Sequence, residues 1–367
     1  MYPIITLLLI AATVVCAEPT QVYIGTAKQG VYATQLDPQT GTLTEPQLVA
    51  DINGAGFLAI HPSQKYLYAT ATTVGDVGSV VAFTIEADGS LSEIGRQPIM
   101  GSRLCHISLD ASAQILMGAN YPGGNVVSLP LHHDGSMGKL VSFHQHEGAS
   151  VHPQRQTSPH AHSIYRGPNN KFAYAPDLGT DKIMIYAIEP ALARLTPFGF
   201  SPSPAGAGPR HMKFGENGRQ AYVLNELSVS ISVYNRNSVS GKLIPHQVVS
   251  TLPAGANRNR MTCSEIQISD NGRFIYCANR DLTAGGRDSL SVFSVDGKGN
   301  IKLIQTVAAK VWIPRHIKLD PSGKWLLVAG QKSNTLPVFN IDPATGRLSD
   351  TGQQIMVPEP MCITFQH

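Results

Sequence analysis

The sequence predicts an all-β fold, a seven-bladed β-propeller, from three observations. Short runs rich in Val, Tyr and Thr alternate with turns along the chain, and no long amphipathic helical pattern interrupts them. One hairpin pattern recurs about every 50 residues, which is the period of a four-stranded propeller blade. The two ends of the chain each supply part of a blade. We therefore expect a single propeller domain over residues 18–367.

The recurring hairpin consists of an apolar strand, a tight turn of the Pro/Asp-x-Gly-Lys/Arg kind, and a second strand that often carries tyrosine. Glycine supplies the positive φ that such turns need. Six complete copies begin at Phe57, Cys105, His162, Arg210, Ser264 and Arg315. Each copy is followed by a third strand, a Gly-containing turn and a fourth strand with Leu near its start.

The seventh blade is split between the two ends of the chain. Residues 21–49 supply three strands but lack an inner one, whereas Met361–Phe365 (MCITF) has the inner-strand pattern and no strands after it. We expect these segments to pair in one blade, because that pairing closes the ring and removes its open edges.

Residues 1–17 predict a signal peptide. Tyr2–Ala17 is uncharged and apolar, is short for a membrane span, and ends in Val15-Cys16-Ala17, which suits signal-peptidase cleavage. The alternative is an uncleaved N-terminal anchor, because only the amino terminus supplies positive charge. We expect an exported protein, periplasmic or secreted, that has no membrane association after cleavage and is a monomer or weak homodimer.

The charge balance and the motifs exclude several classes of function. The net charge is only +3, and no Lys/Arg-rich run or aromatic RNA-binding platform is present, which argues against a nucleic-acid partner. No Gly-x-Ser-x-Gly elbow, Walker loop, Rossmann glycine pattern or metal-ligand spacing occurs. We expect no cofactor, no metal and no serine hydrolase.

The mature chain keeps four cysteines, at positions 105, 263, 277 and 362. Cys263 and Cys277 lie on the two arms of one predicted hairpin, and symmetry about its Asn271-Gly272 turn pairs Cys263 with Arg280 instead. A disulfide between them is therefore not expected. All four cysteines are interpreted as small buried residues.

Polar residues stand where the inner strands begin, and in a propeller these starts converge at one mouth of the central channel. Aligned on the turns, one column contains Gly56, Cys105, His162, Arg210, Ser264 and Arg315. The next column contains Phe57, His106, Ser163, His211, Glu265 and His316. Because adjacent residues of a strand face opposite ways, we expect the two columns to serve two different places.

The second strands end in a comparable polar layer, formed by Asn120-Tyr121, Asp177, Asn225-Glu226, Asn279-Arg280 and Gln331-Lys332. The start of an inner strand and the end of a second strand meet in each hairpin. The hairpin of residues 208–226 therefore brings Arg210 and His211 beside Glu226. A structural interpretation stays open for these charges. Glu226 could pair with Arg210 as a buried salt bridge, and Arg280 could balance Glu226 or Glu265.

Five segments in the right order carry a family resemblance: Gly208–Met212, Asn225–Leu227, Ala278–Arg280, Ala329–Ser333 and the His162-Ser163 strand start. They resemble the lactonase-type seven-bladed propellers, a family that includes bacterial 6-phosphogluconolactonases and carboxy-cis,cis-muconate cyclases. The similarity extends from about Gln21 to His367. It implies metal-independent chemistry on a lactone ring, with an active site of His162, Arg210, Glu226 and Arg280.

The resemblance implies a hydrolase that opens a sugar lactone, phosphorylated or not, to the aldonate. Glu226 or His162 would act as general base on water. Arg210 and Arg280 would stabilise the oxyanion and hold an acidic group of the substrate. A muconate-type cyclase or isomerase could use the same residues, and a propeller that only binds a ligand or protein is the third possibility.

Substrate binding is expected to use five more residues, namely His106, His211, Glu265, Arg315 and Lys332. For a phosphorylated lactone, Arg315 or Lys332 would take the phosphate. The phosphorylated lactone arises in the cytoplasm, whereas this chain carries a predicted export signal. The alternative substrate is therefore an unphosphorylated sugar lactone outside the membrane.

Overall fold

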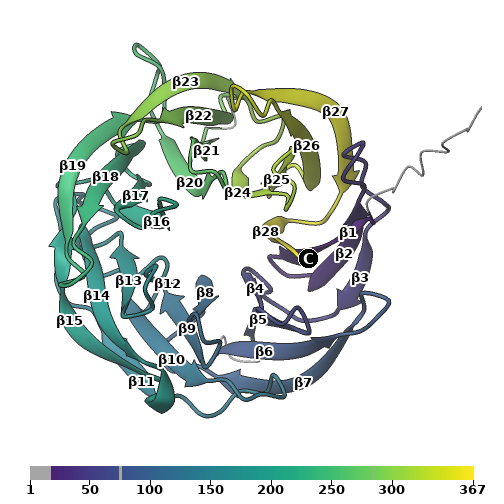
Figure 1. The fold of residues 1–367 in the computed structure, drawn as a ribbon, viewed down its shortest axis with the longest axis vertical. Coiled ribbons are helices and arrows are strands. Elements are labelled where there is room, and N and C mark those ends of the chain that lie inside the picture. The colour runs from purple at the N-terminus through teal and green to yellow at the C-terminus, as the bar shows by residue number, and fades with distance from the viewer. Residues whose placement is uncertain (1–17, 74–76, 284) are drawn as a thin grey trace, which may run out of the picture.

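Short apolar strands and Gly-containing turns fold into seven four-stranded antiparallel sheets arranged around a central axis (Figure 1). This computed structural model describes residues 18–73, 77–283 and 285–367. The predicted seven-bladed β-propeller is confirmed. The predicted signal peptide, residues 1–17, lies outside the described residues. The helical content of the described residues is a single 3-10 turn, η1 (Pro190–Leu192).

Blades 2, 3 and 4 follow one another along the chain, and the strands of each run in order from the channel outward. Blade 2 consists of β4 (Leu58–Ile60), β5 (Tyr66–Thr72), β6 (Gly78–Ile85) and β7 (Leu91–Pro98). Blade 3 consists of β8 (His106–Leu109), β9 (Ile115–Asn120), β10 (Asn125–Pro130) and β11 (Ser142–Gln145). Blade 4 consists of β12 (Tyr165–Arg166), β13 (Phe172–Asp177), β14 (Lys182–Glu189) and β15 (Arg194–Pro202).

Blades 5, 6 and 7 repeat this order. Blade 5 consists of β16 (Pro209–Phe214), β17 (Gln220–Asn225), β18 (Ser230–Arg236) and β19 (Leu243–Ser250). Blade 6 consists of β20 (Met261–Ile268), β21 (Phe274–Asp281), β22 (Ser289–Val295) and β23 (Ile301–Ala308). Blade 7 consists of β24 (Pro314–Leu319), β25 (Trp325–Gly330), β26 (Thr335–Ile341) and β27 (Leu348–Met356).

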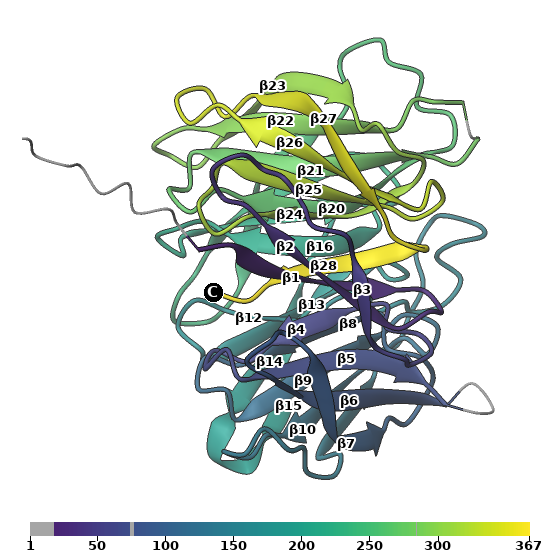
Figure 2. The ribbon, with the colours of Figure 1, turned by 90° about the vertical axis from the view of Figure 1, so that its right-hand side faces the viewer.

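Blade 1 joins the two ends of the chain, as predicted. Its inner strand is β28 (Pro360–Phe365), which pairs antiparallel with β1 (Thr20–Thr26), and β2 (Val31–Leu36) and β3 (Gln47–Ala50) complete the sheet. In Figure 2 the yellow β28 lies beside the purple β1. Because the last strand is held by the first, the ring has no open seam.

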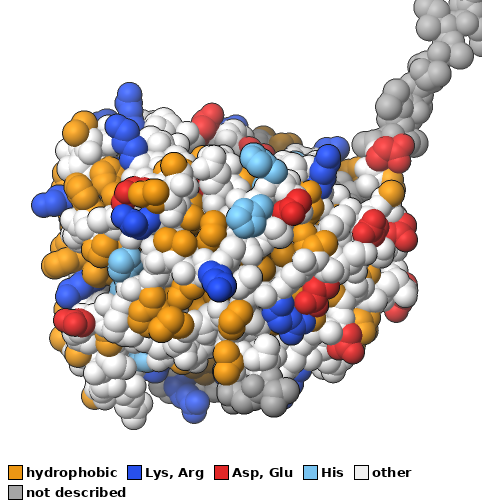
Figure 3. Space-filling model, turned by 90° about the horizontal axis from the view of Figure 1, so that it is seen from below, with side chains coloured by type: hydrophobic (Ala, Val, Ile, Leu, Met, Phe, Trp, Pro, Cys, Tyr) orange, Lys and Arg blue, Asp and Glu red, His pale blue; other side chains and the backbone are white. Residues whose placement is uncertain are grey.

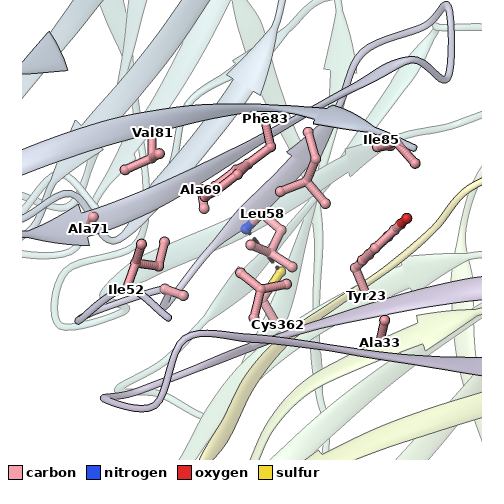
Figure 4. Packing of buried hydrophobic residues seen from close by; sticks show 13 residues of the cluster. Tyr23, Ala33, Ile52, Leu58, Ala69, Ala71, Val81, Phe83, Ile85 and Cys362 are labelled. Carbon is pink, nitrogen blue, oxygen red and sulfur yellow. Dashed lines mark hydrogen bonds between the residues drawn. The ribbon is translucent and has the colours of Figure 1, made fainter. Parts of the chain in front are cut away.

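The core lies between neighbouring blades. Between blades 1 and 2, Tyr23, Leu58, Phe83 and Cys362 pack together (Figure 4), and the Leu58 backbone N–H donates to Cys362 Sγ at 3.4 Å. The cysteines of the described residues, Cys263 and Cys277 among them, are free thiols.

Four of the recurring tyrosines link a blade to the next one. The hydroxyl of Tyr174 in blade 4 donates to the carbonyl of Gly241 in blade 5 at 2.8 Å, and Tyr23, Tyr68 and Tyr222 make the same bond to glycines of their next blades. Gly241 has a φ of 69°, and a Cβ there would lie 2.8 Å from the ring of Phe172. The positive φ and the closeness of the Phe172 ring explain why a glycine stands at this turn.

The face of the molecule drawn in Figure 3 has no dominant charge. In Figure 3 basic, acidic and hydrophobic side chains are interspersed over the face shown. No helix in the described part of the chain is long and apolar enough to cross a membrane.

Four inner strands, β16, β20, β24 and β28, contain β-bulges near their starts. In β20 the bulge shifts the register between Cys263 and Ile266, so that Cys263 pairs with Asn279. The pairing of Cys263 with Arg280, expected from hairpin symmetry, is therefore wrong by one residue. A bulge also increases the local twist of the strand, which re-aims the residues beside it.

Candidate active site

The starts of the inner strands and the ends of the second strands enclose a cavity at one mouth of the channel. Its volume is about 460 Å³, which is within the range of small-molecule sites. Four arginines, Arg103, Arg155, Arg280 and Arg315, share its wall with one carboxylate among the described residues, Glu226. We call it the arginine cavity. The excess of positive charge suits a negatively charged ligand.

Glu226 directly follows β17 and is held by three arginines. Its Oε2 lies 3.0 Å from Arg210 Nε and 3.0 Å from Arg280 Nη2, and its Oε1 accepts a hydrogen bond from Arg155 Nη2 at 2.8 Å. Burial acts to raise the pKa of Glu226, but Arg280 and Arg210 outweigh it and hold the pKa well below its ordinary value. The carboxylate is therefore an anion at neutral pH.

His162 lies just before β12, beside Glu226. Its Nε2 is 3.8 Å from Glu226 Oε2, its Nδ1 is 3.9 Å from Cys105 Sγ, and Tyr121 packs edge-on against its ring at 5.0 Å. Burial, and then the charge of Arg210, holds the pKa of His162 well below its ordinary value. The imidazole is therefore neutral at neutral pH and has a nitrogen available to accept a proton.

Arg280 and Arg315 supply hydrogen-bond donors to the cavity. Arg280 Nη2 also donates to the carbonyl of Cys263 at 2.7 Å, while its buried Nε has no partner in the described structure. Arg315 forms no side-chain hydrogen bond or ion pair with any described residue. Burial, followed by repulsion from Arg210 and Arg280, lowers the pKa of Arg315 to about 9, so its guanidinium stays charged at neutral pH. These unused donors are what an oxyanion or an acidic substituent would bind.

Arg155 and Arg103 were not found by the repeat alignment. Arg155 lies on the long loop between β11 and β12, where its Nη2 also donates to Tyr121 Oη at 2.9 Å, and Tyr121 stacks on His160 at 4.5 Å. Arg103 lies on the loop between β7 and β8 and is exposed. These loops have no counterpart in the hairpin template. The one signal in the sequence was the unusual length of the loop that carries Arg155.

The comparison with known proteins agrees with this architecture. Residues 21–365 match the family described as Lactonase, 7-bladed beta-propeller. The chain belongs to this lactonase family. The 6-phosphogluconolactonase of Bacillus subtilis is 33% identical over 351 residues, covering 94% of this chain and 98% of the relative. The 6-phosphogluconolactonase of Serratia proteamaculans is 31% identical over 347 residues, covering 94% and 98%.

A solved structure gives the same result in three dimensions. The periplasmic gluconolactonase of Pseudomonas aeruginosa superposes with a TM-score of 0.89 at 29% identity, covering 95% of this chain and 99% of that one. The predicted family, the fold and the enzyme class, a hydrolase of lactones, are therefore confirmed.

In this lactonase, five of the nine predicted site residues lie outside the wall of the arginine cavity, and Arg210 and Lys332 are two of them. Arg210 is 2% exposed and lies behind Glu226, where its Nη1 also donates to the carbonyl of Ser264. Lys332 lies after β25 with its side chain 48% exposed, and its Nζ is 3.6 Å from Glu359 Oε1. Arg210 is thus placed to hold Glu226, and Lys332 is placed on the outer surface.

The side chains of the second column lie in a different place from those of the first, as the alternation of side chains along a strand predicted. His106, Glu265 and His316 line another cavity, of about 580 Å³, toward the opposite mouth. His211 Nδ1 lies 2.7 Å from Glu265 Oε2, and His316 Nε2 lies 3.3 Å from the same oxygen. These residues are therefore brought together with one another and not with the wall of the arginine cavity.

The rings of this column pack against each other. The ring centroids of Phe57 and His106 are 4.3 Å apart, those of His106 and His211 5.4 Å, and those of Phe57 and His316 5.9 Å. We call Phe57, His106, His211, Glu265 and His316 the histidine layer. Its one ring contact with the catalytic candidates is His211 against His162 at 5.3 Å. The described residues contain no group of three or more His, Cys, Asp or Glu arranged to hold a metal ion.

Proposed function

We propose that this chain hydrolyses a sugar lactone that carries an acidic group, in the arginine cavity. The observation that carries the proposal is the pairing of a neutral His162 with unused guanidinium donors in a cavity of small-molecule size. The relatives support the substrate class, because two of them are 6-phosphogluconolactonases and one solved neighbour is a gluconolactonase.

His162 is the better candidate for the general base. Three arginines hold the pKa of Glu226 down, so its carboxylate attracts a proton only weakly. His162 is neutral, and a water molecule that gives its proton to Nε2 attacks the lactone carbonyl. Glu226 Oε2, 3.8 Å away, then stabilises the imidazolium that forms.

The arginines stabilise the negative charge that develops. Attack of water places the charge on the former carbonyl oxygen, where the guanidinium of Arg280 or of Arg315 donates to it. The bond from the carbonyl carbon to the ring oxygen then breaks, and the imidazolium of His162 returns its proton to that oxygen. The product is the open-chain aldonate, and the histidine is neutral again.

A rate assay with two substrates tests this proposal. We expect the mature chain, starting at Glu18, to accelerate opening of 6-phosphogluconolactone or gluconolactone above the spontaneous rate, measured as acid release. His162→Asn should lower kcat by about 10²- to 10⁴-fold, the usual contribution of a general base. Arg315→Met should raise KM more for the phosphorylated lactone than for gluconolactone, because it removes a guanidinium.

Lys332→Met is the matched control, since it removes a cation outside the cavity wall. Its kinetics should equal those of the wild type. The absence of acceleration with both lactones would overturn the proposal, as would an active His162→Asn variant. If Lys332→Met lost activity toward the phosphorylated lactone alone, the phosphate would bind on the outer surface and not at Arg315.

The predicted export signal supports gluconolactone, outside the cytoplasm, as a second candidate substrate. The Pseudomonas aeruginosa neighbour named as a periplasmic gluconolactonase supports it too. Sequencing the amino terminus of protein recovered from the periplasm or medium should give Glu18. Full-length protein confined to the cytoplasm would remove the support for this second candidate.

A further inference from the structure

The cavity beyond the histidine layer has a polar ring of its own. Three residues after the first column, the inner strands carry Ser108, Tyr165, Lys213, Gln267 and Lys318. These residues line the cavity of about 580 Å³, together with Thr364 of β28. We call it the lysine cavity. Its polar side chains come from six different blades.

Lys213 and Lys318 bring two positive charges into this cavity without a direct ion pair, although the more distant Glu265 and Asp270 attract Lys318. Neither ammonium lies within 4.0 Å of a carboxylate of the described residues, although both side chains are partly buried. Burial, and then the charge of Lys213, lowers the pKa of Lys318, because the two ammonium groups repel each other. Lys213 Nζ is further positioned over the ring of Tyr165, at 5.5 Å.

The two carboxylates in the wall are occupied elsewhere. Glu265 Oε2 bonds to His211 and His316, and its Oε1 accepts from the Ile266 backbone at 3.0 Å. Asp110 accepts hydrogen bonds from Ser112 and from the backbone of its own turn. Partly buried cations without a counter-ion cost free energy, and an anionic ligand would remove that cost.

We propose that Lys213 and Lys318 form a second binding site of this lactonase, one that takes a phosphate group at the mouth opposite the arginine cavity. The amide of Gln267 lies between the two lysines in the order of the blades and adds a neutral donor. The phosphate is either the free ion or the phosphate of a sugar acid. The inference is independent of the proposed lactone hydrolysis, since the histidine layer lies between the two cavities.

Calorimetric titration at low ionic strength tests the site, first with inorganic phosphate and then with 6-phosphogluconate. The wild type and Arg315→Met should both bind phosphate at the lysine cavity. Lys213→Met/Lys318→Met should weaken that binding by about tenfold or more, because each lost charge-assisted hydrogen bond contributes about 1.5–3 kcal/mol. The wild type could bind 6-phosphogluconate more tightly than phosphate. If the Lys213/Lys318 variant then loses that binding, the ligand is a sugar acid.

Lys298→Met/Lys324→Met is the control, since it removes two exposed lysines and changes the net charge equally. It should bind phosphate as the wild type does. The proposal is overturned if the wild type binds no phosphate, if phosphate binding disappears in Arg315→Met, or if adding Lys213→Met/Lys318→Met to Arg315→Met leaves the remaining phosphate binding unchanged. Lactone turnover should persist in the Lys213/Lys318 variant, and its loss in a variant with unchanged Tm would overturn the separation of the two sites.

Discussion

Glu226 and Glu265 are both buried carboxylates beside the same channel, but their partners differ in kind. Glu226 is surrounded by guanidinium groups, at 2.8–3.0 Å, that keep further donors for a ligand. Glu265 is surrounded by imidazoles, at 2.7 and 3.3 Å, that pack on one another. Permanently charged partners thus form a site with unused hydrogen-bond donors, whereas neutral partners form a packed layer.

The two environments lie one residue apart on the same strands. Arg315 lines the arginine cavity and His316 lines the lysine cavity, and Cys105 and His106 divide in the same way. In β24 a β-bulge shifts the register between Pro314 and His316. An extra residue of this kind turns neighbouring side chains in new directions without interrupting the blade.

The largest expected effect is the difference in protein stability between substitutions of Glu226 and of Glu265. Glu226→Gln should lower the free energy of unfolding by about 3–5 kcal/mol, since it leaves several buried guanidiniums without their anion. Glu265→Gln should cost only about 1–3 kcal/mol, because its partners are neutral and the amide still accepts a hydrogen bond. Urea unfolding of both variants measures the difference. An equal or larger cost for Glu265→Gln would show that the histidine layer is charged in the folded protein.

The fold could be predicted because each blade meets the same local demands. A turn that needs glycine and a tyrosine that bonds to the next blade, as Tyr174 does to Gly241, recur in the sequence at a fixed spacing. His162, Glu226 and Arg280 were found for the same reason, since they stand at the ends of repeated strands.

The rest of the site depends on features that do not repeat. Arg155 belongs to a loop found in one blade connection only, so no column of the alignment contains it. Lys332 stands at a strand end, like Glu226, but it pairs with Glu359 on the outer surface. Strand position alone does not determine whether a long side chain turns inward, since that depends on which counter-charge is nearest in three dimensions.

A second prediction uses pH to separate the two environments. His316, in the histidine layer, has its pKa lowered from 6.5 to about 3, first by burial. Between those pH values the unfolded chain binds a proton that the folded chain does not, so stability falls on acidification by about 1.4 kcal/mol per pH unit for this group. Glu226, with its pKa below 4.5, contributes stability above pH 4.5 that is lost only at lower pH.

The onset of acid destabilisation should therefore lie near pH 6.5 and not near pH 4.5. His316→Gln should reduce the slope between pH 6 and pH 5, whereas His132→Gln, at an exposed position, should leave it unchanged. Urea unfolding at each pH supplies the slope. A stability that stays constant down to pH 4.5 would mean that the buried histidines are protonated in the folded state.

The smallest expected effect concerns Arg155, which lies at the edge of the arginine cavity with 34% of its side chain exposed. Solvent screens its ion pair with Glu226, and Arg210 and Arg280 still hold that carboxylate after its removal. Arg155→Gln should therefore cost only about 0.5–1 kcal/mol of stability, close to the cost of Arg96→Gln, which breaks the exposed pair with Glu93. Thermal unfolding compares the two variants. A loss as large as that of Glu226→Gln would mean that the loop carrying Arg155, and not the inner strands, fixes the position of Glu226.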